Sequence, residues 1–90
     1  MTASRTVEIV NKRGLHARAS AKFVKLAADF EAEVIVTRDG QSVDARSIMG
    51  LMMLGAGIGS MLELSAEGPQ AAEALDALAE LIANRFEEDE

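Results

Sequence analysis

Residues 33–44 read Glu-Val-Ile-Val-Thr-Arg-Asp-Gly-Gln-Ser-Val-Asp, and this stretch decides the fold. The β-branched content of residues 33–38 is typical of a strand. Asp39-Gly40 favours a two-residue turn, so we expect residues 41–44 to return as a short antiparallel strand. The chain is therefore predicted to contain a β-hairpin.

The segments that flank this hairpin show either the period of a strand or the period of a helix. Residues 6–10 and 60–66 alternate apolar and polar side chains, as half-buried strands do. Residues 17–30 and 70–86 carry an apolar stripe at helical spacing, and residues 48–54 form a short helix that is apolar on every side. The expected order is β-α-β-β-α-β-α. Because a helix with one apolar stripe can cover one face of a sheet, the sequence predicts an α+β domain of two layers.

Length and composition limit the classes of protein to which the chain can belong. Ninety residues make one small domain, for which we expect the bounds 1–90 and a frayed acidic end at residues 87–90. Because the chain has no cysteine and only one histidine, its composition predicts no disulfide framework and no zinc site. No apolar run approaches the roughly 20 residues of a membrane span. We expect a cytoplasmic monomer that uses no metal or cofactor and does not insert into a membrane.

The net charge of −6 is unevenly distributed along the chain. Residues 1–25 sum to +5, whereas residues 26–90 sum to −11. An acidic chain without a basic face is a poor nucleic-acid binder, so we expect no nucleic-acid partner. The positive segment surrounds His16, and the field there favours an anion or an acidic partner.

Residues 14–18 read Gly-Leu-His-Ala-Arg and contain the only histidine of the chain. This places His16 at the start of a helix, where unpaired N–H groups and the helix dipole favour a phosphate. An unprotonated imidazole is a nucleophile near neutral pH, and Arg18 can donate forked hydrogen bonds to a phosphoryl group. A lone histidine is more often a solvent-facing loop residue, but Gly14, Arg18 and the basic surroundings favour a phosphoryl acceptor.

Two further features lie at the second predicted helix. Ser47 precedes this helix and is a preferred N-cap residue. The wholly apolar run 48–54 cannot be buried on every side in so small a domain, so we expect part of its isoleucine and methionine side chains to be exposed. Burial of the whole run in the core is the alternative.

The segment Asn11-Lys12-Arg13-Gly14-Leu15-His16-Ala17-Arg18 resembles the active-site segment of the histidine-containing phosphocarrier (HPr) family of the bacterial phosphotransferase system. The resemblance continues through Ala45-Arg46-Ser47-Ile48-Met49, Leu54-Gly55 and Ser65-Ala66-Glu67-Gly68, and it covers essentially the whole chain. It implies an open-faced β-sandwich, in which a four-stranded antiparallel sheet is covered on one face by three helices. It also implies a phosphoryl carrier rather than an enzyme.

The resemblance implies roles for individual residues. The histidine matching His16 accepts a phosphoryl group on Nδ1 from enzyme I, which is charged by phosphoenolpyruvate, and passes it to enzyme IIA domains. The arginine matching Arg18 contacts the phosphate, and the serine matching Ser47 is phosphorylated in many bacteria by HPr kinase/phosphorylase as a regulatory mark. The family docks its partners on its first two helices, where the corresponding residues are Ala17, Lys22, Lys25, Ile48, Met49 and Met52.

Ala19 departs from the family pattern, which usually has proline directly after the arginine. Proline presets the first turn of a helix, so we expect Ala19 to leave the helix start less rigid, by about 1 kcal/mol. Ala19 also adds one N–H donor that proline lacks.

Two other functions stay open. The first is a small phosphatase or acyl-phosphate hydrolase that uses His16 and Arg18, and the second is a non-catalytic regulatory module that acts through Ser47 and the methionine-rich helix. Within the carrier interpretation, the start Val7-Glu8-Ile9-x-Asn11-Lys12, the second helix and the acidic end slightly favour the nitrogen-related regulatory (NPr) branch over the sugar-transport branch.

Overall fold

The secondary structure follows the order that the sequence predicts. The structure, a computed structural model, describes residues 1–90. In chain order its elements are β1 (Thr2–Glu8), α1 (Ala17–Ala27), β2 (Glu33–Arg38), β3 (Gln41–Asp44), α2 (Ile48–Met53), β4 (Met61–Glu67), α3 (Ala71–Ala83) and a 3-10 turn, η1 (Arg85–Glu87). The order β-α-β-β-α-β-α is confirmed. None of the helices is both long enough and apolar enough to cross a membrane.

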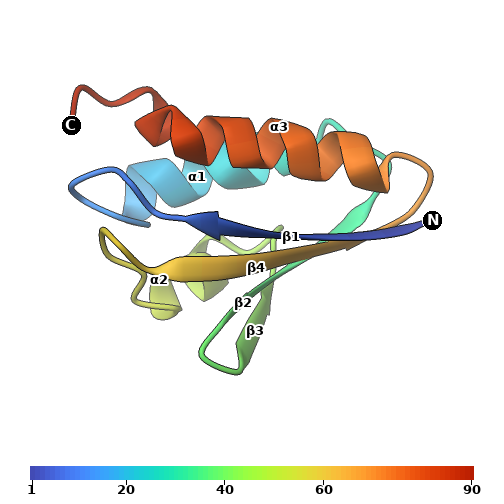
Figure 1. Ribbon diagram of the computed structural model, residues 1–90, viewed down its shortest axis with the longest axis horizontal. Coiled ribbons are helices and arrows are strands. Elements are labelled where there is room, and N and C mark those ends of the chain that lie inside the picture. Colours follow the sequence, from blue (N-terminus) through green and yellow to red (C-terminus); the bar gives the residue numbers. More distant parts are fainter.

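The strands form one antiparallel sheet in the order β1-β4-β2-β3. In β4, Leu62 and Leu64 are buried, whereas Glu63 and Glu67 are exposed. Because side chains alternate across a strand, one face of the sheet is apolar and the other is open to solvent. Figure 1 shows α1 and α3 lying along the same side of the sheet. The predicted α+β fold, an open-faced β-sandwich, is confirmed.

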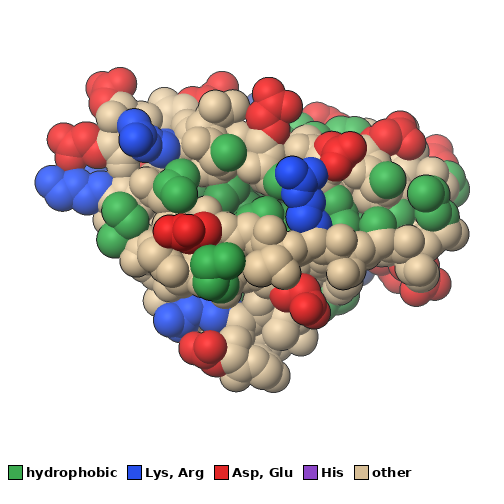
Figure 2. All heavy atoms as spheres, viewed as in Figure 1, with side chains coloured by type: hydrophobic (Ala, Val, Ile, Leu, Met, Phe, Trp, Pro, Cys, Tyr) green, Lys and Arg blue, Asp and Glu red, His purple; other side chains and the backbone are tan.

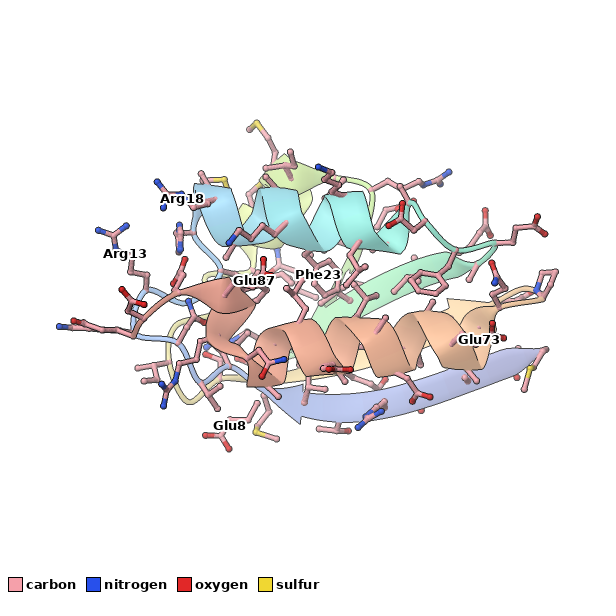
Figure 3. The ribbon with its side chains drawn as sticks, turned by 90° about the horizontal axis from the view of Figure 1, so that it is seen from above. Glu8, Arg13, Arg18, Phe23, Glu73 and Glu87 are labelled. Carbon is pink, nitrogen blue, oxygen red and sulfur yellow. The ribbon has the colours of Figure 1, made fainter.

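The third helix, α2, completes the helical layer. It packs against α1, and Figure 3 shows α1 between α2 and α3. Leu51 and Leu54 point from this region into the core, with exposed fractions of 0% and 3%. One cluster of 20 buried hydrophobic residues thus joins all three helices to the sheet. Phe23 lies between α1 and α3 in Figure 3 and is among the largest fully buried side chains.

The first strand differs from the predicted range 6–10. It begins at Thr2, which pairs with Glu67, and it ends at Glu8. Ile9 leaves the ladder, although its N–H still donates to the carbonyl of Ser60 at 2.9 Å. The polar start of β1 has no apolar alternation, so its pairing depends on backbone hydrogen bonds to β4 that leave little signal in the sequence.

The long helices end earlier than their apolar stripes predict. α1 ends at Ala27, because the N–H of Phe30 bonds to the carbonyl of Ala27, three residues back, as in a 3-10 turn. α3 ends at Ala83, and Phe86 follows in the turn η1, where it is fully buried. A stripe of apolar residues therefore continues into a turn that still faces the core.

Residues 87–90, for which the sequence predicts a frayed acidic end, make specific contacts in the structure. They fold back beside the loop after β1, where Lys12 forms an ion pair with Glu90 and Lys22 with Glu87. Burial of Phe86 anchors the segment, and the positive charges of the loop and of α1 attract its carboxylates. The local sequence shows only an acidic run, which by itself favours solvent.

Candidate functional site

Gly14 holds the loop between β1 and α1 in place. Its φ is +66°, a left-handed conformation that residues with a Cβ adopt only at a cost. A Cβ atom here would lie 2.3 Å from the carbonyl oxygen of Ala56, and the same oxygen accepts a hydrogen bond of 2.9 Å from the N–H of Leu15. Glycine is therefore needed both for the conformation and for the close approach that positions the next residues.

His16 is the N-cap residue of α1. Its backbone carbonyl accepts a hydrogen bond of 2.9 Å from the N–H of Ser20, and its Nδ1 accepts one of 3.3 Å from the N–H of Arg18. Its Nε2 is hydrogen-bonded to the carboxylate of Glu88. Because an ionised carboxylate only accepts, the proton belongs on Nε2, and Nδ1 keeps its lone pair at the positive end of the helix. The imidazole is thus a nucleophile aimed at a site that favours anions.

Arg18 and Ala19 continue the first turn of α1. The Arg18 side chain is exposed and forms no salt bridge, so its guanidinium is free to bind an anion. Ala19 is the third helical residue and is fully buried. Any influence of Ala19 on the site therefore passes through the backbone and not through its side chain.

Asn11 is a fully buried polar residue behind the site that the sequence analysis did not single out. Its Nδ2 donates to the carbonyl of Gly14 at 2.9 Å and to Oε1 of Glu88 at 3.1 Å, whereas its Oδ1 has no hydrogen-bond partner. Asn11 therefore links the loop that carries His16 to the acidic segment. The position of Asn11 in a turn predicts only its local hydrogen bond to Gly14. The second bond could not be predicted in this way, because Glu88 lies 77 residues away along the chain.

Glu88 is the second residue that the sequence analysis missed. Burial raises its pKa, but hydrogen bonds from Asn11 and His16, together with the positive charge of Arg13, outweigh that effect. The net result is a pKa below the usual value, so Glu88 is ionised at neutral pH. The opposite charges of residues 87–90 and of the loop before His16 are the sequence signal that could have found this contact.

An open hollow of about 800 Å³ lies beside His16. It is lined by four cationic and four acidic side chains and by no hydrophobic ones: Lys12, Arg13, Arg18, Lys22, Glu87, Glu88, Asp89 and Glu90. Figure 3 shows Arg13, Arg18 and Glu87 at the same end of the molecule, and Figure 2 shows charges of both signs side by side at the end where the C-terminal residues lie. The carboxylates of the acidic segment thus balance the four cations of the hollow.

Ser47 is the N-cap of α2, as the sequence predicts. Its Oγ accepts a hydrogen bond of 2.9 Å from the N–H of Gly50. The preceding turn is held by Asp44, whose carboxylate accepts from the backbone and from the guanidinium of Arg46 at 2.8 Å each. These hydrogen bonds and the charge of Arg46 keep the pKa of Asp44 below its usual value. The hydroxyl of Ser47 therefore sits at a well-ordered helix start.

The apolar run of α2 is only partly buried, which confirms the expectation of exposed methionines. The exposed fractions are 39% for Ile48, 72% for Met49, 44% for Met52 and 69% for Met53, whereas Leu51 is fully buried. We call Ile48, Met49, Met52 and Met53 the α2 patch. The patch belongs to the helix that packs against α1, so it adjoins the helix that begins at His16.

The structure brings some of the predicted site residues together and separates others from them. Arg18 and Lys22 line the charged hollow, and His16 is hydrogen-bonded to Glu88, which also lines it. Lys22 donates to the carbonyl of Phe86 at 2.7 Å. Ala17 and Lys25 are exposed on α1, but neither lines the hollow. Ser47 and the α2 patch belong to the neighbouring helix.

Comparison with known proteins identifies relatives along nearly the whole chain. A family model described as the PTS HPr component phosphorylation site matches residues 3–84. The phosphocarrier protein HPr of Cupriavidus necator is 58% identical over 86 residues, with 96% of this chain and 97% of the relative covered. The phosphocarrier protein NPr of Escherichia coli is 43% identical, with 99% of this chain and 100% of the relative covered.

Solved structures give the same result for the fold. The crystal structure of HPr-C-His from Thermoanaerobacter tengcongensis superposes with a TM-score of 0.93 at 45% sequence identity, covering 98% of this chain and 99% of that one. Proteins of this type carry phosphoryl groups and are not catalysts. The imidazole at a helix start, the charged hollow beside it and these similarities agree, and the chain belongs to the HPr family of phosphocarriers of the phosphotransferase system.

Proposed function

We propose that His16 is the phosphoryl acceptor and donor of this carrier. The observation that supports this most strongly is the position of Nδ1, which accepts a hydrogen bond of 3.3 Å from the backbone N–H of Arg18 and therefore carries its lone pair at the start of α1. In the forward step the Nδ1 lone pair attacks phosphorus. The P–N bond of a donor phosphohistidine on enzyme I breaks, and its electron pair returns to the donor. Transfer to an enzyme IIA domain follows the same pattern. A nucleophile of the IIA domain attacks phosphorus, the P–N bond to His16 breaks, and its electron pair returns to Nδ1.

Arg18 stabilises the phosphoryl group in this proposal. The backbone N–H of Arg18 donates to Nδ1 of His16, with 3.3 Å between the two nitrogen atoms. This N–H therefore points toward the atom that would carry the phosphoryl group. The unpaired guanidinium of Arg18 supplies charge and forked donors from the side of the hollow. The helix dipole adds to both effects, because a dianion is favoured at a helix N-terminus.

The α2 patch and the cations of α1 form the surface on which enzyme I and the IIA domains dock. Exposed methionines suit a surface that must fit more than one partner, since their flexible side chains adapt to different shapes. Ala17, Lys22 and Lys25 lie on the adjoining helix, and the two lysines supply a charged rim that speeds encounter with acidic surfaces. The chain acts as a monomer in the cytoplasm, in line with its lack of cysteine.

Ser47 is the regulatory site in this proposal, with HPr kinase/phosphorylase as the modifying enzyme. A phosphate there would add about −1.5 to −2 charges beside the α2 patch. The start of α2 tolerates this charge, but an acidic partner surface would be repelled.

The sequence pattern slightly favours the NPr branch, whereas the higher identity to the Cupriavidus necator HPr than to the Escherichia coli NPr favours the HPr branch.

Phosphorylation of the purified chain tests the assignment of His16. The protein is incubated with enzyme I and phosphoenolpyruvate, and acid-labile phosphate is measured for the wild type, His16→Ala and Arg18→Gln. We expect stable phosphohistidine in the wild type, none in His16→Ala and a slower rate in Arg18→Gln. Steady release of phosphate by the wild type alone would indicate a hydrolase instead. If regulation persists in His16→Ala and is lost only in Ser47→Ala, the chain is a non-catalytic regulatory module instead.

A further inference from the structure

The backbone of residues 85–87 takes an unusual route to the site. Arg85, Phe86 and Glu87 have φ values of +57°, +53° and +64°, so three consecutive residues with a Cβ are in the left-handed region. This conformation is unfavourable for each of them. It persists because Phe86 is fully buried in the core and because Lys22 donates to the Phe86 carbonyl at 2.7 Å. The turn aims the following residues at the loop that carries His16.

The acidic segment, residues 87–90, lies beside the proposed phosphoryl site and contacts cations that line the hollow. Glu88 bonds to Nε2 of His16 and to Nδ2 of Asn11, and Glu90 pairs with Lys12 at 3.2 Å. Glu87 lies 3.6 Å from the ammonium of Lys22. Two of the four cations that line the hollow are thus paired with carboxylates of the chain itself.

The same contacts restrict access to the imidazole. The side chain of His16 is only 23% exposed, with Glu88 against its Nε2 edge. A phosphoryl group on Nδ1 would add about −1.5 to −2 charges close to four acidic residues, and like charges at this range repel. A partner that docks around His16 must likewise share the hollow with the segment. The seated segment and the phosphorylated or docked site are therefore mutually unfavourable.

We propose that residues 87–90 form an intramolecular latch, which pairs its carboxylates with Lys12, Lys22 and the Nε2 edge of His16 in the unphosphorylated carrier and swings away for phosphoryl transfer. The inference rests on the proposed role of His16. The buried Phe86 is the fixed end of the latch. The latch lowers the rate of phosphorylation and is expelled by the phosphoryl group that it resembles in charge.

A charge-neutralised variant tests the latch. Glu87→Gln, Glu88→Gln and Glu90→Gln are combined in one protein, which keeps the size of each side chain and removes three negative charges. The matched control combines Glu63→Gln, Glu67→Gln and Glu80→Gln, which are exposed residues of β4 and α3 outside the hollow. Both variants change the net charge equally, so the comparison separates the latch from long-range steering of enzyme I.

Two measurements follow the latch and the transfer separately. The first is the dissociation constant of inorganic phosphate, titrated by the backbone amide shifts of residues 16–18, with the ¹H–¹⁵N heteronuclear NOEs of residues 87–90 recorded alongside. The second is kcat/KM for phosphorylation by enzyme I and phosphoenolpyruvate. In the latch variant we expect phosphate to bind about fivefold tighter and phosphorylation to run about fivefold faster, with low NOEs over residues 87–90. The control should match the wild type.

The outcomes separate the latch from the function on which it rests. Equal phosphate affinity in the latch variant and the control, or low NOEs over residues 87–90 in the unphosphorylated wild type, would overturn the latch. A slower phosphorylation of the latch variant would also overturn it, because the segment would then assist transfer. If the wild type forms no phosphohistidine, the proposed function fails, while the phosphate titration still decides whether the segment competes with an anion beside His16.

Discussion

Gly14→Ala probes the close approach that positions His16. Two costs add in this variant. A left-handed φ of +66° costs an alanine about 1–2 kcal/mol. The new Cβ would lie 2.3 Å from the Ala56 oxygen, so the two loops must separate and stretch the 2.9 Å hydrogen bond that Leu15 donates to the same atom. A hydrogen bond contributes about 1 kcal/mol, and we expect a total loss of about 3 kcal/mol in the free energy of unfolding.

Gly40→Ala is the matched control for this variant. Gly40 has a φ of +80°, but no heavy atom lies within 4 Å of the position that its Cβ would take. Only the conformational cost remains, so we expect a loss of about 1 kcal/mol. Urea denaturation measures both values. For a domain of this size each kcal/mol corresponds to a shift of about 4–8 °C in Tm, which predicts decreases of about 15 °C and about 5 °C.

The rate of phosphorylation provides a second, independent readout. Displacing the loop moves His16 relative to the first turn of α1, so the folded fraction of Gly14→Ala should accept phosphoryl groups more slowly than the wild type. Gly40→Ala should be phosphorylated at the wild-type rate. Equal stability losses in the two variants would refute the argument from the Ala56 contact. An unchanged rate in folded Gly14→Ala would refute the argument that this contact positions the imidazole.

Three further predictions concern the residues around the two helix starts. Phe86→Ala should lower the free energy of unfolding by about 3–5 kcal/mol in urea denaturation, because it empties a fully buried site; a loss below about 1 kcal/mol would show that Phe86 does not anchor the segment. Ser47→Ala should lower it by about 1 kcal/mol through loss of the 2.9 Å cap from Gly50, whereas Ser47→Asp should retain most of that stability. The pKa of Glu88 is lowered in the folded protein, so its stabilising contribution is complete above its ordinary value of 4.5 and is lost as the pH falls through the lower folded value. Between about pH 5 and pH 3 the urea midpoint of the wild type should therefore fall more steeply than that of Glu88→Gln; parallel pH profiles would contradict this contact.

Local signals in the sequence predict most of the fold. The turn at Asp39-Gly40 has φ values of +50° and +80°, as a two-residue hairpin turn requires, and the flanking strands pair in that register. The apolar stripe of the last helix predicts the burial of Leu75, Leu78 and Ile82, although the helix itself ends at Ala83. These features depend on residues within a few positions of one another, which is why periodicity is sufficient to find them.

The limits of sequence reasoning appear where a segment is stabilised by a distant partner. The polar start of β1 becomes a strand because β4 offers it hydrogen-bond partners more than 60 residues away. The acidic run 87–90 would be solvated on its own, and it lies against the loop before His16 because Phe86 is buried and cations face it. Neither the pairing of β1 with β4 nor the contacts of residues 87–90 change the pattern of apolar and polar residues within the segment concerned.

For the site, the sequence by itself predicts which side chains would carry the proposed chemistry. Gly14, His16 and Arg18 are close in the chain, and their spacing alone predicts an imidazole at a helix start with a cation beside it. The tertiary structure decided the state of that imidazole. Glu88 lies 72 residues from His16 along the chain, and it sets the tautomer and covers the ring only because the folded core brings the turn after α3 to the start of α1. A contact over such a distance depends on the packing of the whole domain and therefore leaves no periodic trace in the sequence.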